Sequence, residues 1–150
     1  MSKISVLMSV YKKENPEYLR ASLESILVQT RTADEILLIE DGPLTQELYQ
    51  VVAEYQKKCD YLHVHAMEQN VQLGRALAKG VELCQYDLIA RMDTDDIAMP
   101  DRLEKEEAYM EAHPEVDVVG GAIREFNDEG TIDRVKNMPK TQEEILEYVK

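Results

Sequence analysis

Apolar positions recur along the chain with two different spacings, one typical of strands and the other of helices. Short runs rich in β-branched and apolar residues are typical of strands, and the run at 35–40 is nearly continuous, as expected for a strand covered on both faces. Turn residues at 127–130 separate the last two of these runs. The pattern predicts strands over 3–10, 35–40, 61–66, 86–92 and 116–126, with a sixth after the turn.

Between these runs, apolar residues recur at helical spacing. The first helix begins at Asn15 and Pro16, which suit the N-cap and the first helical position. Thr141 and Glu144 form a capping box for a last helix that runs to the chain end. The apolar helical positions are Leu19, Leu23, Ile26 and Leu27; Leu44, Leu48, Val51, Val52 and Tyr55; Leu73, Ala76, Leu77, Val81 and Cys84; Leu103 and Met110. This alternation predicts an α/β fold: a Rossmann-like, mostly parallel sheet with helices on both faces, in one domain over 1–150.

Composition narrows the function classes. The chain has 150 residues, 44% of them apolar and 31% charged, which describes a globular protein with a substantial core. Its formal net charge of −13 argues against nucleic acid as a partner, because phosphate backbones bind to basic surfaces. No apolar run is long enough for a membrane segment, and no signal peptide opens the chain. Cys59 and Cys84 lie in no CxxC pair, which favours free thiols in a reducing cytoplasm.

Polar residues follow the predicted strands where a ligand is expected. In a parallel α/β sheet, ligands bind beyond the carboxyl ends of the strands. Those ends carry Ser9 to Lys12, Glu40 to Gly42, Asn70, and Asp93 to Asp96. An acidic protein can hold an anionic diphosphate there only through a cation or local donors.

The segment Asp93-Thr94-Asp95-Asp96 is the most distinctive of these. Three carboxylates within four residues repel one another unless a cation is present, and Mn²⁺ or Mg²⁺ prefers oxygen ligands. The alternative is a solvated acidic loop before a helix, where Asp also suits the helix dipole. The preceding apolar run Leu88-Ile89-Ala90 favours the metal site, because it places the carboxylates at the mouth of a buried strand.

Other candidates are weaker on the residues alone. Asp41 could accept a hydrogen bond from a nucleobase, or it could serve only as a turn residue with Gly42. His63 and His65 share a face of one predicted strand, but without a third ligand they are interpreted as ordinary strand residues. Neither a GxGxxG motif nor a phosphate-binding GxxxxGK[ST] loop follows the first strand, which lowers the case for a dinucleotide enzyme or an NTPase.

Four sequence motifs, taken in their order along the chain, resemble those of the family 2 glycosyltransferases, especially bacterial members that build surface polysaccharides. The likeness is carried by Ile4 to Tyr11, Leu38 to Gly42, Asn70 to Gly80 and Ile89 to Asp96. It departs from the family pattern at three places, with Lys12 after the tyrosine, Gln72 where glycine is common, and Leu77 where arginine is common.

The resemblance implies a glycosyltransferase A type fold and a nucleotide-diphospho-sugar donor, most often a UDP-sugar, with Mn²⁺ or Mg²⁺. It implies a glycan or lipid-linked acceptor and inversion at the anomeric carbon. The site residues it implies are Val10 and Tyr11 lining the nucleoside pocket, Asp41 holding the base, Asp93 near the ribose, Asp95 on the metal, Asp96 in the same acidic shell, and Arg91 as a donor-side cation.

The family's catalytic base and acceptor-binding part lie beyond Lys150 in this comparison, so no base is assigned. We therefore expect a truncated domain that binds donor and is inactive alone, from a cytoplasmic parent at the inner face of the membrane. Two other classes are considered. A sugar nucleotidyltransferase would carry a glycine-rich basic loop where Val10 to Glu14 stand, and a receiver-type regulatory module would carry acidic residues after its first strand and a phosphoacceptor after its third.

Overall fold

The computed structural model describes residues 2–127, 129 and 132–149. The chain divides into two compact units, Met1–Glu107 and Ala108–Lys150. The first unit contains the sheet and all of the candidate site residues.

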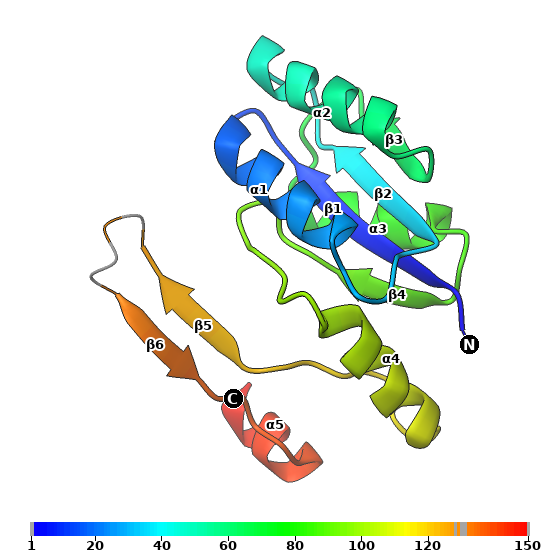
Figure 1. Cartoon of the computed structure of the whole chain (residues 1–150), viewed down its shortest axis with the longest axis vertical. Coiled ribbons are helices and arrows are strands. Elements are labelled where there is room, and N and C mark those ends of the chain that lie inside the picture. The colour runs from blue at the N-terminus through cyan, green and yellow to red at the C-terminus, as the bar shows by residue number, and fades with distance from the viewer. Residues whose placement is uncertain (1, 128, 130–131, 150) are drawn as a thin grey trace. The chain divides into compact units, whose positions relative to one another are not determined.

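The first unit is built on four parallel strands. They are hydrogen-bonded in the order β3-β2-β1-β4, so β1 and β2 lie in the middle (Figure 1). Their bounds are β1 (Ile4–Val10), β2 (Glu35–Glu40), β3 (Leu62–Ala66) and β4 (Leu88–Arg91). The predicted parallel α/β sheet is confirmed, and the carboxyl ends of all four strands lie along one edge.

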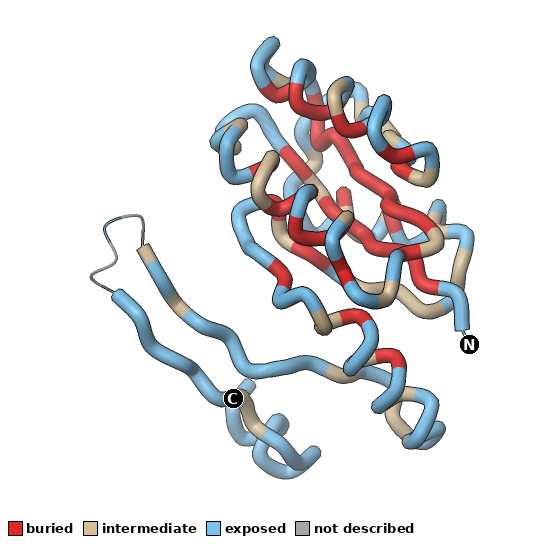
Figure 2. Tube along the Cα trace, in the orientation of Figure 1, coloured by how far each residue is buried: buried red, intermediate tan, exposed pale blue. Residues whose placement is uncertain are grey.

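Helices cover both faces of this sheet. Helices α1 and α2 pack on one face and α3 on the other, and the residues facing the sheet are buried (Figures 1 and 2). The helix bounds are α1 (Pro16–Leu27), α2 (Gln46–Lys58), α3 (Leu73–Leu83) and α4 (Arg102–Ala112). Leu103 at the start of α4 belongs to the same core cluster as α1 and α2. This arrangement agrees with strands that are apolar on both sides.

The start of α1 follows the sequence prediction. The Asn15 side chain accepts a hydrogen bond from the Glu17 backbone N–H at 2.8 Å, so it caps the helix. Leu19, Leu23 and Ile26 are buried against the sheet, as their spacing predicts.

The expected apolar face of α3 is partly wrong. Val81, predicted to face the core, is 54% exposed, and the helix instead presents Ala76 and Gly80 to the sheet. A Cβ atom at Gly80 would lie 2.3 Å from Leu7 Cδ1, so α3 packs too closely on β1 for a side chain there. The small residues therefore form the contact and turn Val81 outward.

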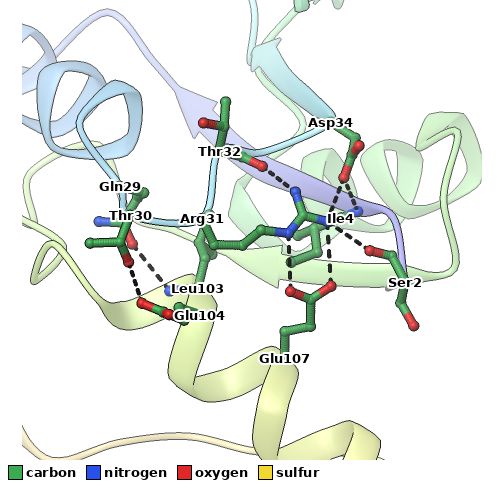
Figure 3. A network of polar contacts seen from close by, with 10 residues as sticks. All are labelled: Ser2, Ile4, Gln29, Thr30, Arg31, Thr32, Asp34, Leu103, Glu104 and Glu107. Atoms are coloured by element: carbon green, nitrogen blue, oxygen red, sulfur yellow. Dashed lines mark hydrogen bonds and ion pairs between the residues drawn. The ribbon is translucent and has the colours of Figure 1, made fainter.

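Arg31, in the loop between α1 and β2, connects that loop to α4 and to the residues before β1 (Figure 3). Its guanidinium donates from Nε to Glu107 at 3.0 Å and from Nη2 to Asp34 at 2.8 Å and to the Ser2 carbonyl at 2.7 Å. These carboxylates raise the Arg31 pKa, the Glu107 hydrogen bond being the largest cause. The Arg31 and Glu107 side chains are only 11% and 7% exposed, so this is a buried ion pair that fixes α4.

The second unit consists of a hairpin and a short helix. Strands β5 (Ile123–Phe126) and β6 (Asp133–Lys136) pair antiparallel, and α5 (Gln142–Tyr148) follows. The predicted strand over 116–126 is wrong for 116–122, where Gly120 and Gly121 interrupt the apolar run and no strand forms. The expected turn at 127–130 includes residues 128 and 130, which lie outside the described residues.

The capping box predicted for α5 is confirmed, because the Thr141 side chain and the Glu144 side chain each accept a backbone hydrogen bond from the other residue. Among the helices in the described ranges, none has the length and apolar character needed to span a bilayer.

Candidate functional site

The carboxyl ends of β1 and β2 bring Val10 and Asp41 together. Val10 is fully buried and pairs in register with Glu40, and the Asp41 backbone N–H donates to the Val10 carbonyl at 2.8 Å. Tyr11, the next residue of the β1–α1 loop, is 45% exposed. Its ring is therefore available at the sheet edge, as a nucleoside-lining role requires.

The Asp41 carboxylate is buried and held by the loop before α3. Its Oδ1 atom accepts a hydrogen bond from the Val71 backbone N–H at 2.7 Å, and its Oδ2 atom accepts one from Asn70 Nδ2 at 3.0 Å. Gly42 follows with a positive φ of 84°, and a Cβ atom on it would lie 2.5 Å from the Asn70 nitrogen. Asp41 is therefore an acceptor in a fixed orientation, and only glycine fits beside it.

Glu40 is a second buried carboxylate at this edge. It is 6% exposed at the end of β2, and burial raises its pKa. Successive residues of a strand point to opposite faces, so Glu40 lies on the α1 and α2 side with Leu38, while Asp41 turns the other way. The sequence pattern alone does not identify Glu40 as a buried charge.

In the acidic loop after β4, Asp93 forms an ion pair, while Asp95 and Asp96 form none within the described residues. Arg91 donates from Nη2 and Nη1 to the two oxygens of Asp93, at 2.6 and 3.1 Å. In the described part of the chain, Asp95 and Asp96 are exposed and neither forms an ion pair. Burial raises the pKa of Asp96, and the charges of Asp95 and Asp93 raise it further, while Arg91 and Arg102 act in the opposite direction.

These residues fit a divalent cation that is coordinated partly by the protein and partly by the phosphates of a bound substrate. Within the described residues no group of three or more His, Cys, Asp and Glu side chains is placed to hold a metal, so no complete protein cage exists there. Mg²⁺ and its relatives are commonly bound through one or two carboxylates plus substrate phosphates. Asp95 and Asp96 could supply those carboxylates, and a cation would relieve the repulsion that raises the Asp96 pKa.

Polar residues of helix α1 hold the backbone of the acidic loop in place. The sequence pattern did not identify these residues as part of the site. Ser22 is fully buried and its hydroxyl donates to the Asp93 carbonyl at 2.9 Å. The Ser25 hydroxyl accepts a hydrogen bond from the Ala98 backbone N–H at 3.0 Å. Because these bonds connect the helix to loop backbone, they set the path of the loop without using its carboxylates.

Gln29, two residues after the end of α1, completes this support. Its Nε2 group donates to the Met99 carbonyl at 2.7 Å, and its Oε1 atom accepts from the Leu103 backbone N–H at 3.1 Å. Ser22, Ser25 and Gln29 recur at helical spacing beside the apolar stripe. That spacing is the one signal that could have identified them as buried.

A hollow in another part of the first unit lacks this chemistry. A shallow depression of about 430 Å³ is lined by Lys3, Tyr86 and Asp87 at the start of β1 and β4, where the Lys3 ammonium lies 5.0 Å from the centre of the Tyr86 ring. Ligands of parallel sheets bind at the opposite edge. The carboxyl edge therefore carries the candidate site.

Comparisons with known proteins agree with this fold. The sequence pattern described as "Glycosyl transferase family 2" matches residues 5–149. The chain is 47% identical to an uncharacterised glycosyltransferase of Haemophilus influenzae over 147 residues, covering 97% of this chain and 55% of that protein. It is 43% identical to the amylovoran biosynthesis glycosyltransferase AmsE of Erwinia amylovora, covering 97% of this chain and 54% of that protein.

A third relative has a more specific name. The UDP-Gal:alpha-D-GlcNAc-diphosphoundecaprenol beta-1,3-galactosyltransferase of Escherichia coli is 34% identical, over 99% of this chain and 54% of that protein. The chain thus spans about half the length of these curated relatives.

Solved structures show the same fold. S. aureus TarS 1–349 in complex with UDP-GlcNAc superposes with a TM-score of 0.66 at 23% identity, over 75% of this chain and 32% of that one. The mannosyltransferase PcManGT of Pyrobaculum calidifontis, in complex with GDP-Man and Mn²⁺, gives 0.65 at 15% identity, over 81% of this chain and 34% of that one. By its fold and by its sequence match over residues 5–149, the chain belongs to glycosyl transferase family 2.

Proposed function

We propose that this chain binds a nucleotide-diphospho-sugar of the UDP-sugar class, together with Mn²⁺ or Mg²⁺. The observation that carries the proposal is the pair of exposed carboxylates, Asp95 and Asp96, which form no ion pair within the described residues and lie at the carboxyl edge of the parallel sheet. A protein of net charge −13 needs a cation to hold a diphosphate there. The UDP-GlcNAc and the GDP-Man with Mn²⁺ named for the two structural neighbours support the same ligand class.

The residue roles follow from position along the edge. Val10 and Tyr11 would line the nucleoside pocket, since Val10 ends β1 beside Asp41 and Tyr11 follows it at the start of the β1–α1 loop. Asp41 would accept a hydrogen bond from the base. That bond would use a carboxylate lone pair that Asn70 and Val71 do not occupy. Hydrogen bonds from two fixed donors hold such an acceptor in one orientation, which favours recognition of one base geometry.

The acidic loop would serve the ribose and the diphosphate. Asp93 would approach the ribose and exchange its Arg91 partner for ribose hydroxyls, which frees Arg91 as a donor-side cation. Asp95 would ligate the metal and Asp96 would complete the acidic shell. When bound, the cation would stabilise negative charge on the departing nucleoside diphosphate.

The transfer itself would place the sugar on a glycan or lipid-linked acceptor, with inversion at the anomeric carbon. The relatives named for amylovoran synthesis and for a diphosphoundecaprenol acceptor support this class. A lipid-linked acceptor would bring the protein to the inner face of the bacterial membrane during surface polysaccharide synthesis. The donor-binding domain is proposed to extend over residues 1–150.

The proposal is tested by comparing two aspartates on either side of β4. Asp95→Asn removes the proposed metal ligand after the strand, and Asp87→Asn removes an exposed carboxylate just before it. Binding of Mn²⁺ in the presence of UDP, followed by the electron paramagnetic resonance signal of free Mn²⁺, should weaken at least tenfold in Asp95→Asn alone. Equal Mn²⁺ affinity in both variants and the wild-type chain would remove Asp95 from the metal site.

A further inference from the structure

Thr94 is the uncharged residue inside the acidic segment, and its side chain is hydrogen-bonded to Glu14 in the β1–α1 loop. It is 4% exposed, and its hydroxyl donates to Glu14 Oε2 at 2.6 Å, across 80 positions of sequence. The same hydroxyl oxygen lies 3.4 Å from the Ser9 carbonyl. A threonine hydroxyl has one proton to donate, and the short distance to a carboxylate makes Glu14 its main acceptor.

Glu14 is itself held in place by its own loop. Its Oε1 atom accepts a hydrogen bond from the Asn15 backbone N–H at 2.8 Å, and its backbone N–H donates to the Tyr11 carbonyl at 3.0 Å. Both carboxylate oxygens of Glu14 are therefore engaged, one by the start of α1 and one by Thr94. The Glu14 carboxylate forms a bridge between the loop that carries Tyr11 and the loop that carries the aspartates.

The bridge holds the backbone directly before Asp95. Asp95 and Asp96 carry like charges and are exposed, so their mutual repulsion does not hold them together. Thr94 precedes Asp95 directly, and the Ser22 hydroxyl holds the Asp93 carbonyl at 2.9 Å on the other side. Two anchors on consecutive residues fix the backbone from which the next carboxylates project.

We propose that Glu14 is a positioning residue that, through Thr94, holds the metal-binding loop in register with the nucleoside side of the donor site. This inference rests on the proposed function, because it assigns Glu14 and Thr94 to the geometry of that same site. Neither residue needs to touch the metal. Residues that orient metal ligands typically change metal affinity by 10- to 100-fold when they are removed.

The test compares two threonine–glutamate hydrogen bonds of equal length, one part-buried at Thr94 and one exposed at Thr30. Thr94→Val removes the hydroxyl and keeps the side-chain shape, and Thr94→Ser restores the hydroxyl. The control is Thr30→Val, since the Thr30 hydroxyl donates to Glu104 Oε2 at the same 2.6 Å, away from the site (Figure 3). Each variant is titrated with Mn²⁺ in the presence of UDP and is also melted without ligand.

The inference predicts that Thr94→Val weakens Mn²⁺ affinity by 10-fold or more, that Thr94→Ser recovers most of it, and that Thr30→Val leaves it unchanged. Glu14→Ala should weaken it to a similar degree, and the double variant Glu14→Ala/Thr94→Val should be no worse than either single one. If Thr94→Val melts at lower temperature but binds Mn²⁺ and UDP like the wild-type chain, the bond is purely structural and the inference is wrong. Should Thr94→Val not fold, Glu14→Ala and Thr94→Ser decide the question. A folded wild-type chain that binds no Mn²⁺ with UDP would refute the proposed function itself.

Discussion

Replacement of Gly42 by alanine tests whether the turn after β2 fixes the Asp41 carboxylate. Gly42 has a φ of 84°, in the left-handed region. A Cβ atom added there would lie 2.5 Å from the Asn70 nitrogen and 2.9 Å from the Gln69 carbonyl carbon. Both atoms belong to the backbone, so the neighbouring loop must move to admit a methyl group. The same loop donates both hydrogen bonds to Asp41.

The expected cost has two parts. A left-handed conformation costs an alanine about 1–2 kcal/mol relative to glycine. Displacing the loop weakens two hydrogen bonds to a buried carboxylate, each worth about 1.5–3 kcal/mol. Because partial relaxation keeps some of this bonding, we expect Gly42→Ala to lower the free energy of unfolding by about 3–5 kcal/mol. For a chain of this size that corresponds to a fall in melting temperature of roughly 6–20 °C.

Urea unfolding followed by circular dichroism measures this loss, with Gly74→Ala as the matched control. Gly74 lies in the first turn of α3, has no positive φ, and has nothing within 4 Å of an added Cβ. Alanine is favoured over glycine in helices by up to about 1 kcal/mol, so the control should be as stable as the wild-type chain or slightly more so. A Gly42→Ala variant within about 1 kcal/mol of the wild-type chain would show that the loop yields freely, and would refute the claim that it fixes Asp41.

Two further predictions concern buried charges. Arg31→Met should lower the free energy of unfolding by about 3–5 kcal/mol, because it leaves the Glu107 carboxylate buried without its partner. Arg20→Met, which breaks the more exposed pair with Glu54, should cost less than about 1 kcal/mol, and equal losses in urea unfolding would contradict the assignment of Arg31 as a buried hub. Burial raises the pKa of Glu40, so its contribution to stability is fully present below its unfolded pKa and is lost as pH rises through the folded pKa. Glu40→Gln should therefore melt above the wild-type chain at pH 8 and lose that advantage towards pH 4; a lower melting temperature of the variant at pH 8 would show that the ionised carboxylate is stabilised in the fold.

Much of the fold could be predicted because it depends on local pattern. The continuous apolar run of β2 and the spacing of Leu19, Leu23 and Ile26 in α1 each indicate an element and its buried face without reference to the rest of the chain. The strand predicted over 116–126 was too long because a strand also needs a partner, and β6 pairs only with 123–126. The buried position predicted for Val81 is wrong because it depends on tertiary packing, namely the close contact between Gly80 and Leu7.

The candidate site divides in the same way. The position of the acidic segment after a buried strand was predictable, since it depends on chain order alone. The anchors of that segment were not, because Ser22 and Glu14 meet Asp93 and Thr94 across 71 and 80 positions of sequence. A serine on a helix has the same sequence pattern whether it faces water or a distant carbonyl group. Asp41 is similar, because its two donors lie 29 and 30 positions away.

The central claim is that a divalent cation joins this acidic protein to a nucleoside diphosphate. Calorimetric titration of the wild-type chain with UDP, first with Mn²⁺ and then with EDTA, tests it most directly. The account predicts saturable binding of UDP with Mn²⁺ and loss of that binding when EDTA removes the metal. Binding of equal strength in EDTA, or no binding by a chain shown to be folded, would contradict it.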